Sequence, residues 1–241
     1  MEQEGRNVIY NIVATGSDGN CTILNYSLAV DMGVPFKAIK HDAGKLKLVL
    51  LTHEHSDHFC EATIRRLAFE RPALRFGCCP WLVDKLLSCG VRRENIDVYT
   101  PGKTSIYAAQ GLYVCPVETP HNVPNCAYKI HMAGDNGGTV FYATDCGSLD
   151  GITAKNFDLY LVEANHTQAE IEERAAAKEA QGLFAYERKA AENHLSREQA
   201  EAWLADNMAF RGVWIPMHGH REKGGGDDGG APNVCENDRP V

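Results

Sequence analysis

The run HEHSDH at 53–58 holds three histidines and two carboxylates in six residues, and only Thr52 separates it from the apolar stretch 46–51. His53 and His55 are two residues apart, so at an extended strand end their side chains point the same way. Asp57 and His58 follow in the turn. Neutral imidazoles and carboxylates are ligands of zinc, and also of manganese or iron. The run therefore predicts two divalent metal ions, with His53 and His55 on one and Asp57 and His58 on the other.

A polar loop is the alternative interpretation of this run. Ser56 and Asp57 are residue types that cap helices, and a helix is predicted directly after them. An HxH pair alone often has that explanation. The full HxHxDH pattern after an apolar strand is much rarer, and we interpret it as a metal-ligand set.

Alternating strands and helices are predicted to position these side chains. Apolar patterns and turn residues predict strands at 8–14, 21–24, 27–31, 46–51, 74–77, 106–118, 127–132, 139–144, 158–163 and 213–217. Helical periodicity predicts helices at 34–41, 61–69, 81–88, 168–191 and 197–207. Ser196 and Gln199 form the pattern of a capping box for the last helix.

Composition limits the classes of protein that the chain can represent. The 241 residues are 44% hydrophobic, which is enough for one large domain or two small ones. The net charge of −8 argues against a protein that binds nucleic acids non-specifically through an overall positive charge. No secretory signal and no apolar run of membrane-spanning length is visible, and the nine cysteines lack zinc-finger spacing. We expect a cytoplasmic protein, without membrane association, whose cysteines are reduced and mostly buried.

Three features together resemble the metallo-β-lactamase superfamily: the HxHxDH run, the GSDGN turn at 16–20, and Asp31-Met32-Gly33 at the end of a strand. The resemblance implies an α/β fold, a four-layer αββα sandwich with a dinuclear metal site at one sheet edge. It covers a hydrolase domain that we place at 1–221. The Gly/Asp-rich segment 222–241 has no periodicity and is predicted to be a disordered tail. Asp31 is a candidate hydrogen-bond partner for the imidazoles, and equally a turn residue.

The resemblance implies three further ligands, each after a predicted strand. His121 lies between prolines, Asp145 follows 139–144, and His218 follows the last strand. The sequence His218-Gly219-His220 leaves the register of the last ligand open, and we favour His218 because it directly follows the strand. The implied set divides as follows: His53, His55 and His121 on the first metal, Asp57, His58 and His218 on the second, and Asp145 between them.

Within this superfamily the chain is most similar to the phosphodiesterase branch, especially the YycJ-type exonucleases and, more distantly, tRNase Z. Three segments carry this similarity: the glycine turn TGSDGN at 15–20, EANH at 163–166, and NHLS at 193–196. A pair of metals about 3.5–4 Å apart can activate a bridging water and bind both the entering and leaving oxygens of a phosphoester.

The resemblance also implies catalytic residues besides the metals. His194 precedes a helix, where the dipole favours an anion, so it can contact the phosphate or protonate the leaving oxygen. Glu163 would orient it, and Asp57 would act catalytically as well as bind metal. Asn20 and His166 are candidate substrate-binding residues. The alternatives are that His194 and His166 only begin or cap their loops, and that the glycine turn is a simple hairpin turn.

The sequence leaves the substrate open between several candidates. A basic strip lies between residues 61 and 94, and it could guide a polyanion or be a set of solvated helix faces. We expect a metal-dependent nuclease acting on DNA; the alternatives are a phosphodiesterase for cyclic nucleotides and a metal-binding module without turnover. A homodimer is expected from the relatives. The strip consists of Arg65, Arg66, Arg71, Arg75, Lys85, Arg92 and Arg93.

Overall fold

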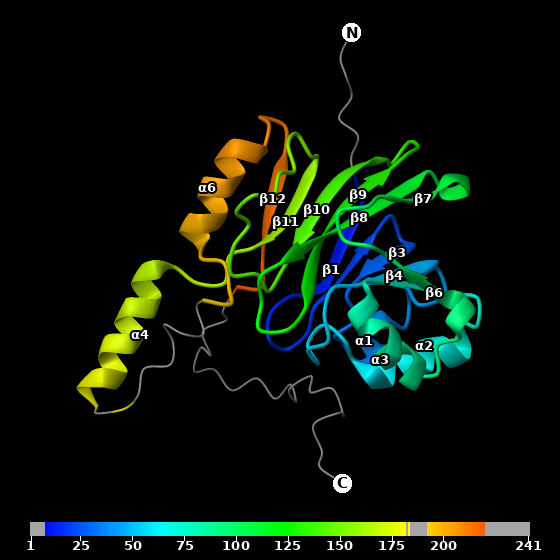
Figure 1. Ribbon diagram of the computed structural model, residues 1–241, viewed down its shortest axis with the longest axis horizontal. Helices are drawn as coiled ribbons and strands as arrows, with labels where there is room; N and C mark the ends of the chain where they lie inside the picture. The colour runs from blue at the N-terminus through cyan, green and yellow to red at the C-terminus, as the bar shows by residue number, and fades with distance from the viewer. Residues whose placement is uncertain (1–7, 182, 184–191, 220–241) are drawn as a thin grey trace. The chain divides into compact units, whose positions relative to one another are not determined.

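A computed structural model describes residues 8–181, 183 and 192–219. The predicted tail at 222–241 and His220 lie outside the described residues. The described chain divides into an N-terminal unit, residues 8–103, and a C-terminal unit, residues 104–219. Each unit contains a six-stranded sheet (Figure 1).

The N-terminal unit is a mixed sheet with its helices on one face. Its strands follow the chain order: β1 (Tyr10–Ala14), β2 (Cys21–Leu24), β3 (Leu28–Val30), β4 (Leu48–Leu51), β5 (Arg75–Cys78) and β6 (Ile96–Val98). Helices α1 (Phe36–Ile39), α2 (Glu61–Glu70) and α3 (Val83–Ser88) gather together (Figure 1). The 3-10 turns η1 (Pro80–Leu82) and η2 (Arg93–Asn95) come before and after α3 in the chain. Val49 and Phe76 of the sheet pack with Ile64 and Leu86 of the helices. Because β3, β4 and β5 are parallel, the residues after β3 and β4 reach the same sheet edge.

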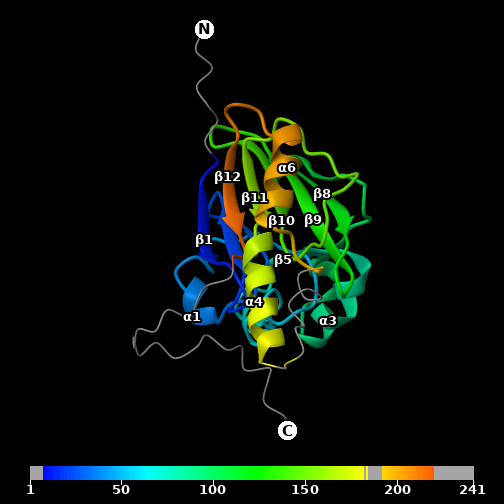
Figure 2. The same ribbon diagram turned by 90° about the vertical axis from the view of Figure 1, so that its left-hand side faces the viewer.

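The C-terminal unit has the sheet order β12-β11-β10-β9-β8-β7. Figure 2 looks onto α6, which lies across β10 and β11, and Leu204 of α6 packs with Phe141 and Tyr160 of those strands. Strands β10, β11 and β12 are parallel, so the residues that follow them lie at one edge. The elements are β7 (Ser105–Tyr107), η3 (Ala108–Gln110), β8 (Leu112–Thr119), β9 (Asn125–Met132), β10 (Gly138–Ala143), β11 (Leu159–Glu163), α4 (Gln168–Ala180), α6 (Arg197–Asn207) and β12 (Val213–Met217).

The α/β class is confirmed, and so are most of the predicted elements. The single strand predicted at 106–118 is wrong, because η3 and Gly111, with φ 58°, divide it into β7 and β8. The short strand β6 was not predicted. The helix predicted at 168–191 ends at Ala180, and residues 184–191 lie outside the described part of the chain.

Two further expectations can be compared with the structure. Among the described residues, none of the helices has the length and apolar character needed to cross a membrane. The eight described cysteines form no disulfide; seven are buried and Cys115 is half-buried, as expected for apolar filling residues.

Candidate metal centre

His53 and His55 leave the end of β4 with a geometry that suits one metal ion. His53 Nε2 lies 3.0 Å from His55 Nδ1, and the two rings are nearly perpendicular, at 82°. Two nitrogens bound to one zinc at about 2.0–2.1 Å in tetrahedral geometry would be separated by roughly 3.3 Å. The two nitrogens are therefore already close to the separation that a shared ion requires.

Asp31 is a buried carboxylate that organises this strand end. Its Oδ1 accepts hydrogen bonds from the Thr52 backbone N–H at 3.0 Å and the Thr52 hydroxyl at 2.9 Å. The same hydroxyl lies 3.0 Å from His53 Nδ1, and Asp31 Oδ2 lies 2.7 Å from His58 Nδ1. Because a carboxylate only accepts, this network places the imidazole protons of His53 and His58 on Nδ1. Both Nε2 atoms are left with lone pairs that can bind metal.

Asp31 also serves as a turn residue, so both of its predicted roles are present. Its φ is +60°, a conformation that Asp tolerates better than most residues. The Asp57-His58 turn packs closely against Gly33, since a Cβ at Gly33 would overlap the carbonyl of Asp57. Gly33 is thus required for the position of the Asp57-His58 turn.

Asn20 is fully buried beneath this turn. Its Nδ2 lies 2.8 Å from His58 Nε2 and 3.3 Å from Asp57 Oδ2, and its Oδ1 accepts from the Gly16 N–H at 3.0 Å. A metal bound at His58 Nε2 would take the lone pair that now faces Asn20, and the amide could then donate to Asp57. These contacts give Asn20 a positioning role, and its predicted contact with substrate stays a prediction.

In the C-terminal unit, Glu163 is the fully buried carboxylate that organises the histidines. Its Oε2 accepts from the backbone N–H groups of Cys146 at 3.0 Å and Leu195 at 3.3 Å. Its Oε1 lies 2.7 Å from His194 Nδ1 and 3.4 Å from His218 Nδ1. Glu163 Oε1 therefore bonds the His194 ring and contacts the His218 ring.

The ionisation of Glu163 and His194 reflects this pairing. Burial raises the pKa of Glu163, but the hydrogen bonds with His194 and His218 outweigh burial and leave the pKa below its usual value. Burial lowers the pKa of His194, but the bond to Glu163 outweighs it and raises the pKa overall. The pair therefore favours a carboxylate facing an imidazole N–H.

Asp145 and His218 turn out of β10 and β12 toward this group. Both have positive φ, 52° and 53°, and Asn125 Nδ2 holds the Asp145 turn by donating to its carbonyl at 2.6 Å. His218 Nε2 lies 3.2 Å from Asp145 Oδ1. One ligand atom from each of Asp145, Glu163, His194 and His218 lies within 4.8 Å of the others. All but the half-buried His194 are buried, and oxygen and nitrogen donors of this kind suit a divalent cation.

His121 contacts the backbone of Asn193, which lies 72 residues further along the chain. Its Nδ1 lies 3.2 Å from the carbonyl of Asn193, so Nδ1 carries the proton and Nε2 keeps a lone pair that could bind a metal. Its ring centroid is 5.7 Å from that of His194. The ring of His194 in turn stacks on His218 at 5.2 Å, with an interplanar angle of 8°.

The structure thus gathers the predicted residues within each unit. His53, His55, Asp57 and His58 meet at the end of β4, whereas His121, Asp145, Glu163, His194 and His218 meet at the ends of β10–β12. Sequence reasoning missed Thr52, Asn125 and Asn165, whose side chains bond His53, the Asp145 turn and His218. The available signals were the position of Thr52 beside His53 and the place of Asn165 in the EANH segment.

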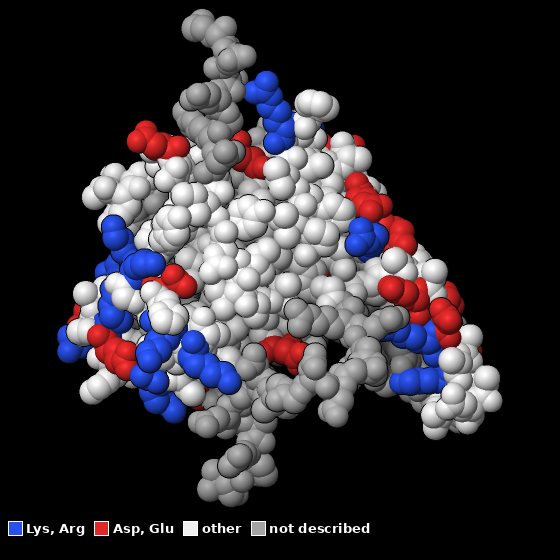
Figure 3. Space-filling view, turned by 180° about the vertical axis from the view of Figure 1, so that it is seen from behind, with Lys and Arg blue, Asp and Glu red and all other residues white. Residues whose placement is uncertain are grey.

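The basic strip is mostly neutralised within the N-terminal unit. Salt bridges join Arg65 to Glu61, Arg66 to Glu70, Arg75 to Asp97 and Lys85 to Glu54. Arg71 donates to the carbonyl of Leu46 at 3.0 Å and so stabilises the fold. Figure 3 shows basic side chains gathered at the lower left with acidic ones among them. These pairings are typical of solvated helix faces.

Comparisons with solved structures find similar folds at low sequence identity. The metallo-β-lactamase fold protein YhfI from Bacillus subtilis has a TM-score of 0.53 and 19% identity, over 66% of this chain and 72% of YhfI. Human tRNase Z, short form, has a TM-score of 0.57 and 12% identity, over 87% of this chain and 92% of that chain. A diphosphatase from the PhnP family has a TM-score of 0.58 and 12% identity, over 87% and 85%. These likenesses establish the fold.

Comparison with sequence families identifies the superfamily to which the chain belongs. No curated protein sequence matches the chain significantly. The family described as "Beta-lactamase superfamily domain" matches residues 28–218, which include every predicted metal ligand. The chain therefore belongs to the β-lactamase superfamily and has the fold of its metal-dependent hydrolases.

Proposed function

We propose that this protein hydrolyses phosphodiester bonds and that its physiological substrate is a nucleic acid, with DNA as the first candidate. The observation that carries the proposal is the buried Glu163, which bonds His194 and contacts His218. The segments EANH and NHLS, which resemble the phosphodiesterase branch, are thereby joined at one carboxylate.

The proposed metal ligands come from the resemblance and fit the local geometry of each unit. Bound divalent ions would supply an activated water and positive charge for the phosphoryl oxygens. The protein contributes by fixing His58, and His53 through Thr52, in the tautomer that presents the Nε2 lone pair, through Asp31. Glu163 orients His194 in the same way. The proposed set is His53, His55, Asp57, His58, His121, Asp145 and His218.

His194 has the geometry of a residue that acts on the substrate. Its Nδ1 faces Glu163, so Nε2 points away from the buried carboxylate. It also lies two residues before Ser196, the N-cap of α6, and backbone N–H groups at a helix N-terminus favour an anion. We assign Nε2 to the phosphate or to the leaving oxygen, to which it would give a proton.

A cyclic nucleotide is the second candidate substrate, because the basic strip is mostly neutralised by its own salt bridges. A polynucleotide track needs cations that are available for phosphates. A small phosphodiester needs only the site itself. The two candidates therefore differ in whether the strip contributes to binding.

One assay separates these functions. The protein, loaded with manganese or zinc, is incubated with labelled double-stranded DNA, single-stranded DNA, RNA and a panel of cyclic nucleotides, with Asp57→Ala as the blank. Stepwise shortening of DNA is the expected result and would make the protein an exonuclease. Opening of a cyclic nucleotide with polynucleotides intact would support the second candidate. Metal binding with no hydrolysis of any substrate would identify a non-catalytic metal-binding module and would refute the proposal.

A further inference from the structure

The peptide groups that precede the two histidines at the end of β4 are both held by side chains from η1 and α3. The indole N–H of Trp81 donates to the Thr52 carbonyl at 3.2 Å, and the ammonium of Lys85 donates to the Glu54 carbonyl at 2.7 Å. Because a peptide group is planar, fixing its carbonyl also fixes the N–H of the histidine that follows. These two bonds therefore set the direction in which the chain enters each histidine.

The fold brings these two donors to the end of β4. Strands β4 and β5 are parallel and pair up to their last residues, so the segments that follow them reach the same sheet edge. The turn η1 starts two residues after β5 and continues directly into α3. Trp81 and Lys85 are four residues apart and lie on the same side of this segment, while Leu82 and Leu86 are buried in the core of the unit.

Lys85 binds the backbone of the HEHSDH run more closely than it binds a charge. Its Nζ lies 2.7 Å from the carbonyl oxygen of Glu54 but 4.0 Å from the carboxylate of the same residue. A contact of that length between partly exposed charges contributes little. The ammonium also lies 5.0 Å from the ring centroid of the fully buried Phe59, within the range of a cation–π contact. Lys85 thus contacts the run near its start and just beyond its end.

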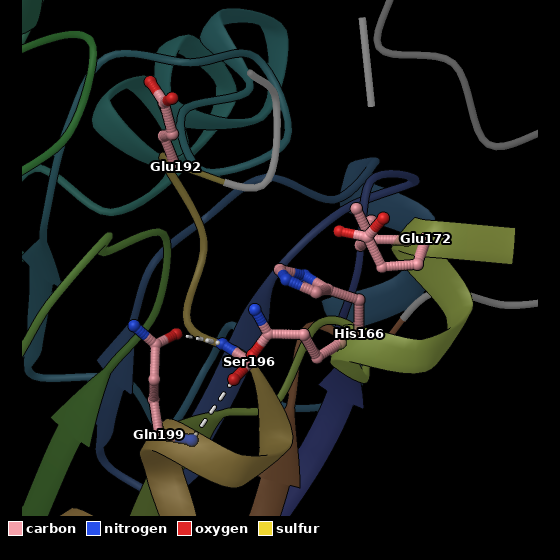
Figure 4. Close-up of a pocket in the computed structure, with 7 residues that line it drawn as sticks. His166, Glu172, Glu192, Ser196 and Gln199 are labelled. Carbon is pink, nitrogen blue, oxygen red and sulfur yellow. Dashed lines mark hydrogen bonds between the residues drawn. The ribbon is translucent and has the colours of Figure 1, made fainter. Parts of the chain in front are cut away.

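The loop before α6 is held by a different kind of contact. The Ser196 N–H donates to Gln199 Oε1 at 2.9 Å and the Gln199 N–H donates to Ser196 Oγ at 3.2 Å, along the dashed lines in Figure 4. His166 pairs with Ser196 beside this turn, and its predicted contact with substrate stays a prediction. These capping bonds form with the helix itself. The bonds from η1 and α3 span 29 and 31 residues, so they depend on how α3 packs in the N-terminal unit.

We infer that Trp81 and Lys85 are positioning residues for the first metal ion, which they serve by holding the backbone of His53 and His55. Both act through proposed ligands, so this role rests on the proposed function. His53 Nε2 and His55 Nδ1 already lie 3.0 Å apart, near the roughly 3.3 Å that a shared tetrahedral zinc requires. A preorganised pair loses less conformational freedom when it binds an ion. Releasing either peptide group therefore weakens metal binding although every ligand is still present.

The first test measures metal binding without substrate. Metal-free protein is titrated with zinc in competition with a chromophoric chelator, and with cobalt followed by its visible absorption. Lys85→Met removes the donor and keeps an unbranched stem, and Trp81→Phe keeps an aromatic ring but removes the N–H. We expect each variant to bind one of the two metal equivalents about tenfold more weakly, with a changed cobalt spectrum for that equivalent.

Two matched controls separate this role from a general loss of stability. Lys45→Met removes a lysine that pairs with Asp42 at 3.5 Å and lies over the ring of Tyr26, and these contacts are outside the HEHSDH run. Trp203→Phe removes an indole bond to the Ile152 carbonyl, 2.8 Å long, in the C-terminal unit. Both controls should keep the metal affinity of the wild type, even where their thermal unfolding shifts as much as in Lys85→Met or Trp81→Phe.

A rescue and a combined variant test whether Lys85 acts through the histidine pair. Lys85→Arg retains a cationic donor for the Glu54 carbonyl and should restore most of the affinity. In His53→Ala/His55→Ala, which lacks the pair, adding Lys85→Met should leave the remaining metal affinity unchanged, because the coupled partner is gone. Wild-type affinity in both Lys85→Met and Trp81→Phe, or an equal loss of affinity in the two controls, would overturn the inference.

Hydrolysis distinguishes this role from the proposed function. Turnover of bis(p-nitrophenyl) phosphate by Lys85→Met and Trp81→Phe should recover at saturating metal, since both variants retain all the proposed ligands. A wild type that binds two metal equivalents and cleaves no phosphodiester would refute the proposed function and leave the positioning role standing. An active wild type whose metal affinity is unchanged in both variants would refute the positioning role alone.

Discussion

Asp31 and Glu163 are buried carboxylates that each organise two histidines, one in each unit of the chain. Asp31 orients His58 directly and His53 through Thr52, and both are proposed metal ligands. Glu163 orients His218, a proposed ligand, together with His194, which we assign to the substrate. We therefore expect Asp31 to affect only metal binding, and Glu163 to affect both metal binding and proton transfer.

The two carboxylates also differ in how their remaining oxygen is satisfied. Asp31 Oδ1 is bonded by the adjacent strand end, through the backbone and hydroxyl of Thr52. Glu163 Oε2 accepts from two backbone N–H groups that lie 17 and 32 residues away, in Cys146 and Leu195. Glu163 thus ties three loops together, and its loss should disturb more of its unit.

The largest effect is expected when the imidazole of His194, which Glu163 orients, is removed. His194→Ala should reduce kcat about 10²- to 10⁴-fold, as for removal of a general acid. Its metal content, measured by mass spectrometry of the purified protein, should stay near that of the wild type. Unchanged turnover would remove His194 from the chemistry, and loss of metal would make it a ligand.

Removing the carboxylate of Asp31 should give the opposite pattern, with weaker metal binding and a turnover that excess metal restores. Asp31→Asn removes the acceptor that holds His58 Nδ1–H and should weaken metal affinity about 10- to 100-fold. Turnover should recover at saturating metal, which a metal titration of activity would show. A low kcat that excess metal does not restore would contradict the assigned role of Asp31.

A smaller effect tests the relay through Thr52. Thr52→Val keeps the backbone N–H bond to Asp31 but removes the hydroxyl between Asp31 and His53. We expect metal affinity to fall severalfold, less than in Asp31→Asn, and Thr52→Ser should restore it. Equal affinities in the two Thr52 variants would show that the hydroxyl has no part in orienting His53.

The smallest effect is expected at the basic strip. Arg65 and Arg66 pair with Glu61 and Glu70 on the exposed face of α2, so Arg65→Gln/Arg66→Gln should change the free energy of unfolding by less than about 1 kcal/mol. Turnover of a cyclic nucleotide should be unchanged. A loss of DNA cleavage with a reduced salt dependence would instead identify the strip as a polynucleotide track.

Local sequence signals predicted much of the site because its proposed ligands follow strands with clear apolar patterns. The HEHSDH run was predicted at the end of a strand and lies there, and the capping box of Ser196 and Gln199 is confirmed. Ligand positions beyond this run depended on the family resemblance. A single histidine such as His121 has no local pattern of its own.

The unpredicted features depend on contacts between distant residues or on backbone geometry. Asp31 meets His58 across 27 residues and Asn165 meets His218 across 53, which no local pattern encodes. Strand β6 has only three residues, too few for a period-two pattern. The break between β7 and β8 depends on the left-handed conformation of Gly111, inside a run that otherwise alternates like one strand.

The most direct test measures metal content and turnover on the same samples. Metal-free protein is titrated with manganese or zinc, the bound metal is counted, and hydrolysis of bis(p-nitrophenyl) phosphate is followed alongside. A two-metal phosphodiesterase should be inactive without metal and reach full activity as the second equivalent binds, and a chelator should reverse this. Protein that binds two equivalents and cleaves no phosphodiester, or that cleaves at the same rate without metal, would contradict the proposed function.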